Sequence, residues 1–259
     1  MKINKLTFLV ALAAVLSTAQ AQTIWNNLGD TFSWSDGLNW STGVQPVSGA
    51  TIQIGTQPSF DTVVVDTSGP VTVASFAFNN TLTNVVEVAL AGAETLQING
   101  AITNNSSFTD TFSLPVIAGA SAVWSGPLIF SNNVTIGTTQ ITLANAITYS
   151  GSNLNFDITN ASTYGRFLGA GTATVTGVTI NIGGAYTGVA SDTFDFSSGN
   201  FSGATLGTLP VLGGGLTWNT TNFLTTGVLT VAVPEPTTWA LLAGSLTTVM
   251  VFRRRRSNT

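Results

Sequence analysis

The chain has 259 residues, with seven basic and eleven acidic side chains, a formal net charge of −4, and neither histidine nor cysteine. Without those two residue types, Ser-His and Cys-His catalysis, histidine or thiolate metal sites and disulfides are excluded. EF-hand spacing, the Gly-Gly-x-Gly-x-Asp calcium nonapeptide and a lysine-bearing phosphate loop are also missing, so we expect no metal and no cofactor.

Residues 1–21 have the pattern of a secretory signal peptide. Lys2 and Lys5 form a charged start, Leu6 to Leu16 form an apolar stretch, and Ala19-Gln20-Ala21 is a small-x-small cleavage site in which Ala19 and Ala21 are the small residues. A first transmembrane helix is the alternative, but the apolar run is short and ends at that site. The sequence therefore predicts a signal helix and an exported body that starts near Gln22.

The predicted exported body is almost free of positive charge. Between Gln22 and Val233 its one basic residue, Arg166, stands against ten acidic residues, which gives a net charge of −9. Binding to nucleic acid depends on Lys and Arg to neutralise phosphates, so we expect no nucleic-acid partner.

Residues 22–60 are rich in tryptophan and turn-forming residues. Trp25, Trp34 and Trp40 lie within 16 residues of one another, and the alternating segment Thr51-Ile52-Gln53-Ile54 follows them. Large aromatic side chains bury much surface, and an array of strands needs a covered end. We therefore interpret this region as an N-terminal cap; a sugar-stacking platform of exposed indole rings is the alternative.

Residues 61–232 alternate between short β-type runs and Gly, Asn or Ser breaks, without a helical period. Clear strand segments include Thr62 to Asp66, Val71 to Phe78, Leu128 to Phe130, and Gln140 to Leu143. Such breaks every 6–12 residues or so are typical of all-β chains. Asparagines recur at the predicted corners, where they tolerate left-handed backbone. The low charge suits a coil whose outward side chains form ladders of uncharged polar groups. We predict an all-β fold, a right-handed parallel β-helix or other β-rich solenoid, with a β-sandwich as the alternative.

The tail, residues 233–259, has three parts in order. Val233, Pro234, Glu235 and Pro236 form a short motif, an apolar run extends from Trp239 to Phe252, and Arg253, Arg254, Arg255 and Arg256 follow. A membrane span needs roughly 17–25 residues, and snorkelling arginines can lengthen a shorter one. An interfacial tryptophan at one end and a basic cluster at the other suit a transmembrane helix whose arginines are cytoplasmic.

The motif, apolar helix and arginine cluster together resemble the PEP-CTERM sorting signal of exported bacterial proteins. The resemblance implies recognition of Pro234, Glu235 and Pro236 by an exosortase-type membrane peptidase, transient anchoring in the inner membrane, and delivery to the cell surface or exopolysaccharide matrix. A plain C-terminal anchor is the alternative.

Two parts of the body resemble autotransporter-like repeat proteins that carry the same tail. The matching segments include Trp25, Asn39-Trp40-Ser41, Asp192-Thr193-Phe194-Asp195-Phe196, Leu209-Pro210 and Gly215-Leu216-Thr217-Trp218-Asn219. This resemblance implies a β-helical or β-rich body without a known catalytic activity.

Carboxylates are the catalytic groups that remain. Glycoside cleavage needs two carboxyl groups about 5–10 Å apart, and lyases of this fold type also use a basic residue, here Arg166. Asp192 and Asp195 would point to opposite faces of one strand. We therefore predict a non-enzymatic exported structural protein with no catalytic residue. A carbohydrate-binding or adhesive module and a carboxylate-dependent polysaccharide-cleaving enzyme are the alternatives.

Overall fold

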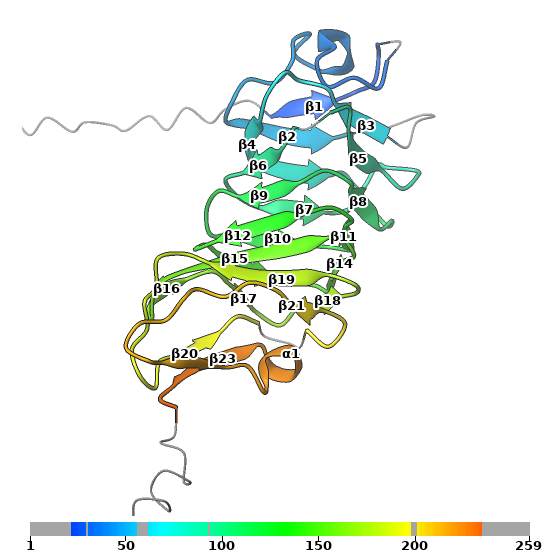
Figure 1. Ribbon diagram of the computed structural model, residues 1–259. Coiled ribbons are helices and arrows are strands. Elements are labelled where there is room, and N and C mark those ends of the chain that lie inside the picture. Colours follow the sequence, from blue (N-terminus) through cyan, green and yellow to red (C-terminus); the bar gives the residue numbers. More distant parts are fainter. Residues whose placement is uncertain (1–21, 30, 56–61, 93, 198–200, 235–259) are drawn as a thin grey trace, which may run out of the picture.

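The structure is a computed structural model that describes residues 22–29, 31–55, 62–92, 94–197 and 201–234. Its regular structure is almost entirely β-strand, with one short 3-10 helix, η1 (Gly37–Asn39), and one helical turn, α1 (Phe223–Thr226). The strands stack along one axis into an elongated β-solenoid, with β1 near one end and β23 near the other (Figure 1).

Most strands belong to three parallel ladders. The first ladder contains β4 (Val71–Phe78), β6 (Leu96–Ile98), β9 (Val116–Ala118), β12 (Val134–Gly137), β15 (Asn153–Asn160), β19 (Thr179–Gly183) and β21 (Thr205–Leu206). The second contains β1 (Thr23–Trp25), β2 (Ala50–Ile54), the second half of β4, β7 (Ile102–Asn104), β10 (Ala122–Ser125), β13 (Gln140–Leu143) and β17 (Arg166–Leu168). The third contains β3 (Thr62–Val65), β5 (Glu87–Leu90), β8 (Asp110–Phe112), β11 (Leu128–Phe130), β14 (Ile147–Tyr149) and β18 (Ala173–Val175).

Each coil of the solenoid passes through the three ladders in the same order. β6, β7 and β8 make one coil, β9, β10 and β11 the next, and β12, β13 and β14 the one after. The long strand β4 serves two ladders, because Val71–Val73 pairs with β6 and Phe76–Phe78 pairs with β7. The parallel pairing confirms the predicted solenoid. It rules out the β-sandwich alternative, in which neighbouring strands run antiparallel.

Coil length varies along the chain. Paired positions lie 18 residues apart at Phe112 and Phe130, but 26 residues apart at Tyr149 and Val175. Part of the added length is a short strand, β16 (Thr163–Tyr164), that folds back antiparallel onto β15. Because coil length changes, the sequence has no fixed repeat, although the strands stack regularly.

A stack of aromatic rings fills the interior beside the third ladder. The rings of Phe112 and Phe130 lie 5.2 Å apart with 9° between their planes, and those of Phe130 and Tyr149 lie 5.3 Å apart at 11°. Trp124 stacks on Phe130 at 5.1 Å, and Phe167 stacks on Tyr149 at 5.5 Å. All five side chains are at most 2 % exposed. Neighbouring strands are about 4.8 Å apart, so rings at equivalent positions of successive coils meet face to face.

The corner asparagines act differently from the prediction. Among the described residues, the non-glycine residues with positive φ are Asn27 and Ser191, so the asparagines predicted to adopt left-handed backbone at corners do not do so. Their side chains hold corners by hydrogen bonds instead: Asn104 Nδ2 donates to the Pro127 carbonyl oxygen at 2.7 Å. At this corner the residue with positive φ is Gly126, and a Cβ added to it would lie 2.1 Å from the Asn104 carbonyl oxygen.

Polar side chains form the predicted ladder on the outside of the first ladder. Asn153 Nδ2 donates to Asn133 Oδ1 at 3.1 Å. Asn181 Nδ2 donates at 3.1 Å to both Asn153 Oδ1 and Asn155 Oδ1. These amide contacts join successive coils without using charge, which explains how so uncharged a surface can still hold neighbouring coils together.

The C-terminal end of the solenoid is closed by a small antiparallel sheet. It contains β20 (Thr193–Asp195), β22 (Thr217–Asn219) and β23 (Val228–Ala232), with β23 in the middle. Phe194 and Phe223 of this region are fully buried. The change from parallel to antiparallel pairing ends the series of coils.

Candidate functional site

The predicted sorting segment starts where the folded body ends. β23 finishes at Ala232, and Val233, 62 % exposed, and Pro234, also exposed, follow directly. The rest of this segment lies outside the described residues, as do the predicted signal cleavage residues: Glu235, Pro236, Trp239, Phe252, Arg253, Arg254, Arg255 and Arg256, together with Ala19 and Ala21. The start of the motif is therefore accessible and directly follows the last strand of the body.

Within the part of the chain that the structure describes, no helix has the length and apolar character needed to cross a bilayer. The predicted signal helix and the predicted C-terminal transmembrane helix both fall outside that part.

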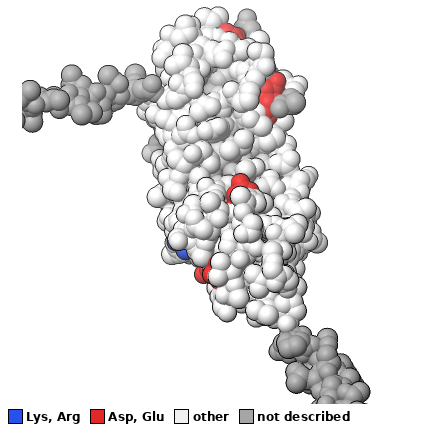
Figure 2. All heavy atoms as spheres, turned by 60° about the vertical axis from the view of Figure 1, so that its left-hand side comes forward, with Lys and Arg blue, Asp and Glu red and all other residues white. Residues whose placement is uncertain are grey.

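The acidic side chains are dispersed over the body. Figure 2 shows isolated red patches and one small blue patch on a face that is otherwise free of charged side chains. Among the described residues, no group of three or more acidic side chains is placed to hold a metal ion.

Several acids have structural partners. Asp110 is fully buried at a corner, where its Oδ1 accepts from the Val86 N–H at 2.6 Å and its Oδ2 accepts from Ser106 Oγ at 2.8 Å. Burial raises the pKa of Asp110, and these hydrogen bonds oppose the rise. Asp192 Oδ2 accepts from the Tyr186 hydroxyl at 2.6 Å. Each carboxylate ties a loop to a neighbouring element.

Arg166, the candidate basic residue, is occupied by neutral neighbours. Its Nη1 donates to the Tyr164 hydroxyl and its Nη2 to Gln140 Oε1, both at 3.3 Å, and its guanidinium lies 5.3 Å from the centre of the Tyr164 ring. Asp195 Oδ1 accepts from the Ser197 N–H at 3.3 Å. Within the described residues Arg166 makes no ion pair, so these contacts give no support to a lyase-type acid–base site.

The three N-terminal tryptophans are buried, so the hypothesis that they form a sugar-stacking platform is wrong. Trp25, Trp34 and Trp40 are 0 %, 0 % and 2 % exposed. The Trp40 ring lies edge-on to Trp25 at 4.9 Å and to Trp34 at 4.6 Å, and its Nε1–H donates to the Trp34 carbonyl oxygen at 2.8 Å. Rings packed against one another present no face to a ligand.

The same segment closes the open strand edges at this end. The Trp34 N–H donates to the Val64 carbonyl oxygen and the Val64 N–H donates to that of Phe32, both at 2.8 Å, which covers the edge of β3. The Ser41 N–H donates to the Ile24 carbonyl oxygen at 2.8 Å, which covers β1. Unpaired strand edges can pair with strands of other chains. By covering these edges, the segment prevents another chain from adding to the solenoid at this end.

Asp66 fastens this cover to the first coil. Its Oδ1 accepts from the Ser35 N–H at 2.9 Å, and its Oδ2 accepts from Ser35 Oγ at 2.8 Å and from Ser33 Oγ. Burial raises the pKa of Asp66, but the hydrogen bonds from Ser33 and Ser35 outweigh it and hold the pKa below its ordinary value of 3.8.

We expect Asp66→Asn to destabilise the protein at neutral pH by about 1 kcal/mol, because an amide replaces one acceptor oxygen with a donor and the site is partly exposed. A folded pKa below the unfolded one means that the carboxylate stabilises the fold above about pH 4 and that this contribution is lost as pH falls through the folded pKa. Denaturant unfolding at pH 7 and pH 3 measures both effects, and the difference between variant and wild type should shrink at pH 3. Asp157→Asn, on an outer strand position, is the control, and an equal effect of both changes at pH 7 would contradict the assignment.

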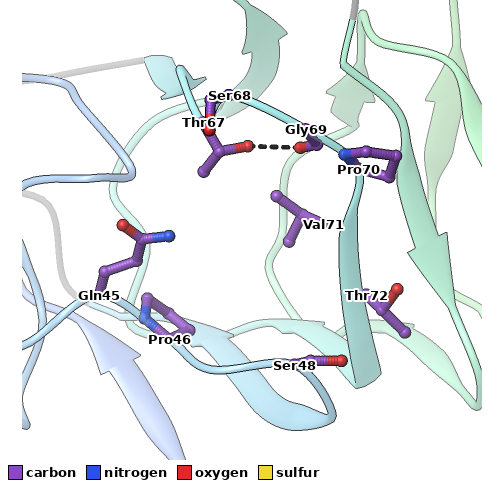
Figure 3. A pocket seen from close by; sticks show the side chains of 9 residues that line it. All are labelled: Gln45, Pro46, Ser48, Thr67, Ser68, Gly69, Pro70, Val71 and Thr72. Atoms are coloured by element: carbon purple, nitrogen blue, oxygen red, sulfur yellow. Dashed lines mark hydrogen bonds between the residues drawn. The ribbon is translucent and has the colours of Figure 1, made fainter.

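A pocket of about 310 Å³ opens at the corner between β3 and β4 (Figure 3). It is lined by Gln45, Pro46, Ser48, Thr67, Ser68, Gly69, Pro70, Val71 and Thr72. Figure 3 shows residues 45–48 on one side and 67–72 around the other. The Gly49 N–H donates to the Thr72 carbonyl oxygen at 2.9 Å and joins the two walls, and Thr67 Oγ1 donates to the Gly69 carbonyl oxygen at 2.7 Å. The lining contains no charged residue, and sequence reasoning missed this pocket because its two walls are distant in the chain.

No family model, no curated protein and no solved structure matches this chain.

Proposed function

We propose that this chain is an exported, non-catalytic structural protein of the cell envelope or exopolysaccharide matrix. It is anchored first in the inner membrane by its tail and is then cut by an exosortase-type membrane peptidase, which releases or transfers the body. We also propose that the solenoid is a right-handed β-helix.

The order of features at the C-terminus carries the proposal. The last strand of the body ends at Ala232, and the Pro-Glu-Pro motif, the apolar run and the four arginines follow without an intervening domain. A peptidase needs an extended and accessible segment, and the exposed Val233 and Pro234 provide its beginning.

The composition of the body supports a structural function. Histidine and cysteine are absent from the sequence, and the acids with described partners fasten loops rather than converge on one point. A surface of hydroxyl and amide groups suits contact with neutral matrix components better than with nucleic acid.

Replacing Pro234 and Glu235 with alanine is expected to block removal of the tail, because the peptidase would no longer recognise the motif. The measurement is the mass and C-terminal residue of the mature protein from producing cells. Wild-type protein should end near residue 234, and the variant should retain the arginine cluster. Thr237→Ala with Thr238→Ala, just beyond the motif, is the matched control and should be processed normally. An unchanged mature mass in the motif variant would refute sorting through this motif.

A further inference from the structure

We propose that the pocket between residues 45–48 and 67–72 binds one unit of a neutral saccharide chain. The biological meaning of this site rests on the proposed exported location. The binding itself does not, because it can be measured on the purified protein whether or not the tail is cut.

The polar groups of the pocket match a ligand with many hydroxyls. The side chains of Gln45, Ser48, Ser68 and Thr72 make no hydrogen bond to any described residue, so their polar atoms are available to a ligand. Each can act as donor and as acceptor, which is what a sugar hydroxyl requires. An anionic ligand would need a cation in the lining and a cationic ligand would need a carboxylate, and neither is present.

The apolar part of the lining suits the C–H faces of a sugar ring. Pro46 and Val71, both buried, line opposite walls of the pocket, and the exposed Pro70 precedes Val71. The prolines and the bond between Gly49 and Thr72 fix the backbone of both walls. A pre-formed site loses little entropy on binding, and a volume of about 310 Å³ lies at the lower end of the range of small-molecule sites.

The outer surface next to the pocket is also uncharged, although its amide groups already hydrogen-bond to neighbouring coils. Thr72 pairs with Gln97 on the neighbouring strand. From strand to strand, the next paired positions are Ile117, Thr135, Asn155 and Asn181, and these six residues form one column along the first ladder. All of them are half-buried, and none is charged. At a strand spacing of about 4.8 Å, the five steps of this column extend roughly 24 Å along the solenoid axis. A column of this length favours an extended saccharide chain over a single sugar.

Calorimetric titration of the purified full-length protein tests this site. The probes are the neutral hexasaccharides cellohexaose, laminarihexaose and maltohexaose, with hexagalacturonate as the charged comparison. At least one neutral probe should bind saturably, and hexagalacturonate should bind at least about tenfold more weakly because no cation is present to pair with it. Binding of none of the neutral probes, or equal binding of the charged one, would overturn the proposal.

Two variants locate the binding to the pocket. Ser68→Trp fills the pocket from an exposed turn and should lower affinity by at least about tenfold, and Gln45→Ala should lower it by about three- to tenfold through loss of one hydrogen bond. Ser150→Trp, also at an exposed serine but directly after β14 of the third ladder, should stay within about twofold of wild type. Circular dichroism melts confirm that the variants are folded. If both pocket variants bind as wild type does, the site is elsewhere and the proposal is wrong; tail processing, read by mass, is unaffected by either result.

Discussion

Replacing Phe130 with alanine is expected to destabilise the body by about 3–5 kcal/mol, which corresponds to a fall in Tm of about 6–20 °C. Phe130 is fully buried and is the ring on which Phe112, Tyr149 and Trp124 all stack, at 5.1 to 5.3 Å. Its removal leaves a cavity in the middle of the stack, and the strands around it are held by backbone bonds that prevent collapse into the space. Thermal and denaturant unfolding followed by circular dichroism measure the effect.

The neighbouring residue supplies a matched control. Ile129 lies on the same strand, β11, but its side chain points outward and is partly exposed. Ile129→Ala should therefore lower the free energy of unfolding far less, by about 1 kcal/mol or below. If the two variants melt at the same temperature, the aromatic stack is not a main source of stability.

The sequence predicted individual strands well because their alternation is local. The segments Val71 to Phe78 and Gln140 to Leu143 correspond to β4 and β13 with the same bounds. Each directs apolar residues toward the core and small or polar residues outward, apart from one interruption at Ala74-Ser75, and this pattern depends on no distant contact. The low charge likewise indicated polar ladders, which the asparagine contacts at Asn133, Asn153 and Asn181 confirm.

Pairing partners could not be predicted from the same pattern. Phe112 pairs with Phe130 and Tyr149 with Val175, and the different chain distances hide the repeat. In the antiparallel end sheet, β20 also pairs with β23, a segment far from it in the chain. Alternation says which residues face inward, but it does not say which strand lies next to which.

The two candidate sites differ in how much of each could be predicted from the sequence. The proposed sorting motif is contiguous, so Pro234, Glu235 and Pro236 could be proposed from their order with the apolar run and the arginines. The pocket brings Gln45 next to Ser68 across a fold corner, and neither residue carries a distinctive chemical signature alone. For Trp25, Trp34 and Trp40, composition permitted both a cap and a platform, and burial decided between them.

Replacing Trp40 with alanine is expected to open the N-terminal end of the solenoid, at a local cost of about 3–5 kcal/mol. The change removes both edge-to-face ring contacts and the hydrogen bond from Trp40 Nε1 to the Trp34 carbonyl oxygen. In a solenoid each coil contacts its neighbours alone, so the loss should be concentrated in the first coils. Hydrogen exchange should show β1 and β2 losing protection while β14 keeps it.

Exposure of the end should also change how the molecule associates. Once the segment around Ser41 no longer covers β1, the free edge can pair with another copy, and size-exclusion chromatography should reveal higher-order species. Leu38→Ala is the matched control, because Leu38 lies in the same segment but is 66 % exposed, and it should leave both exchange and oligomeric state unchanged. Uniform loss of protection along all three ladders in the Trp40 variant would mean that the tryptophan cluster supports the whole solenoid rather than its end.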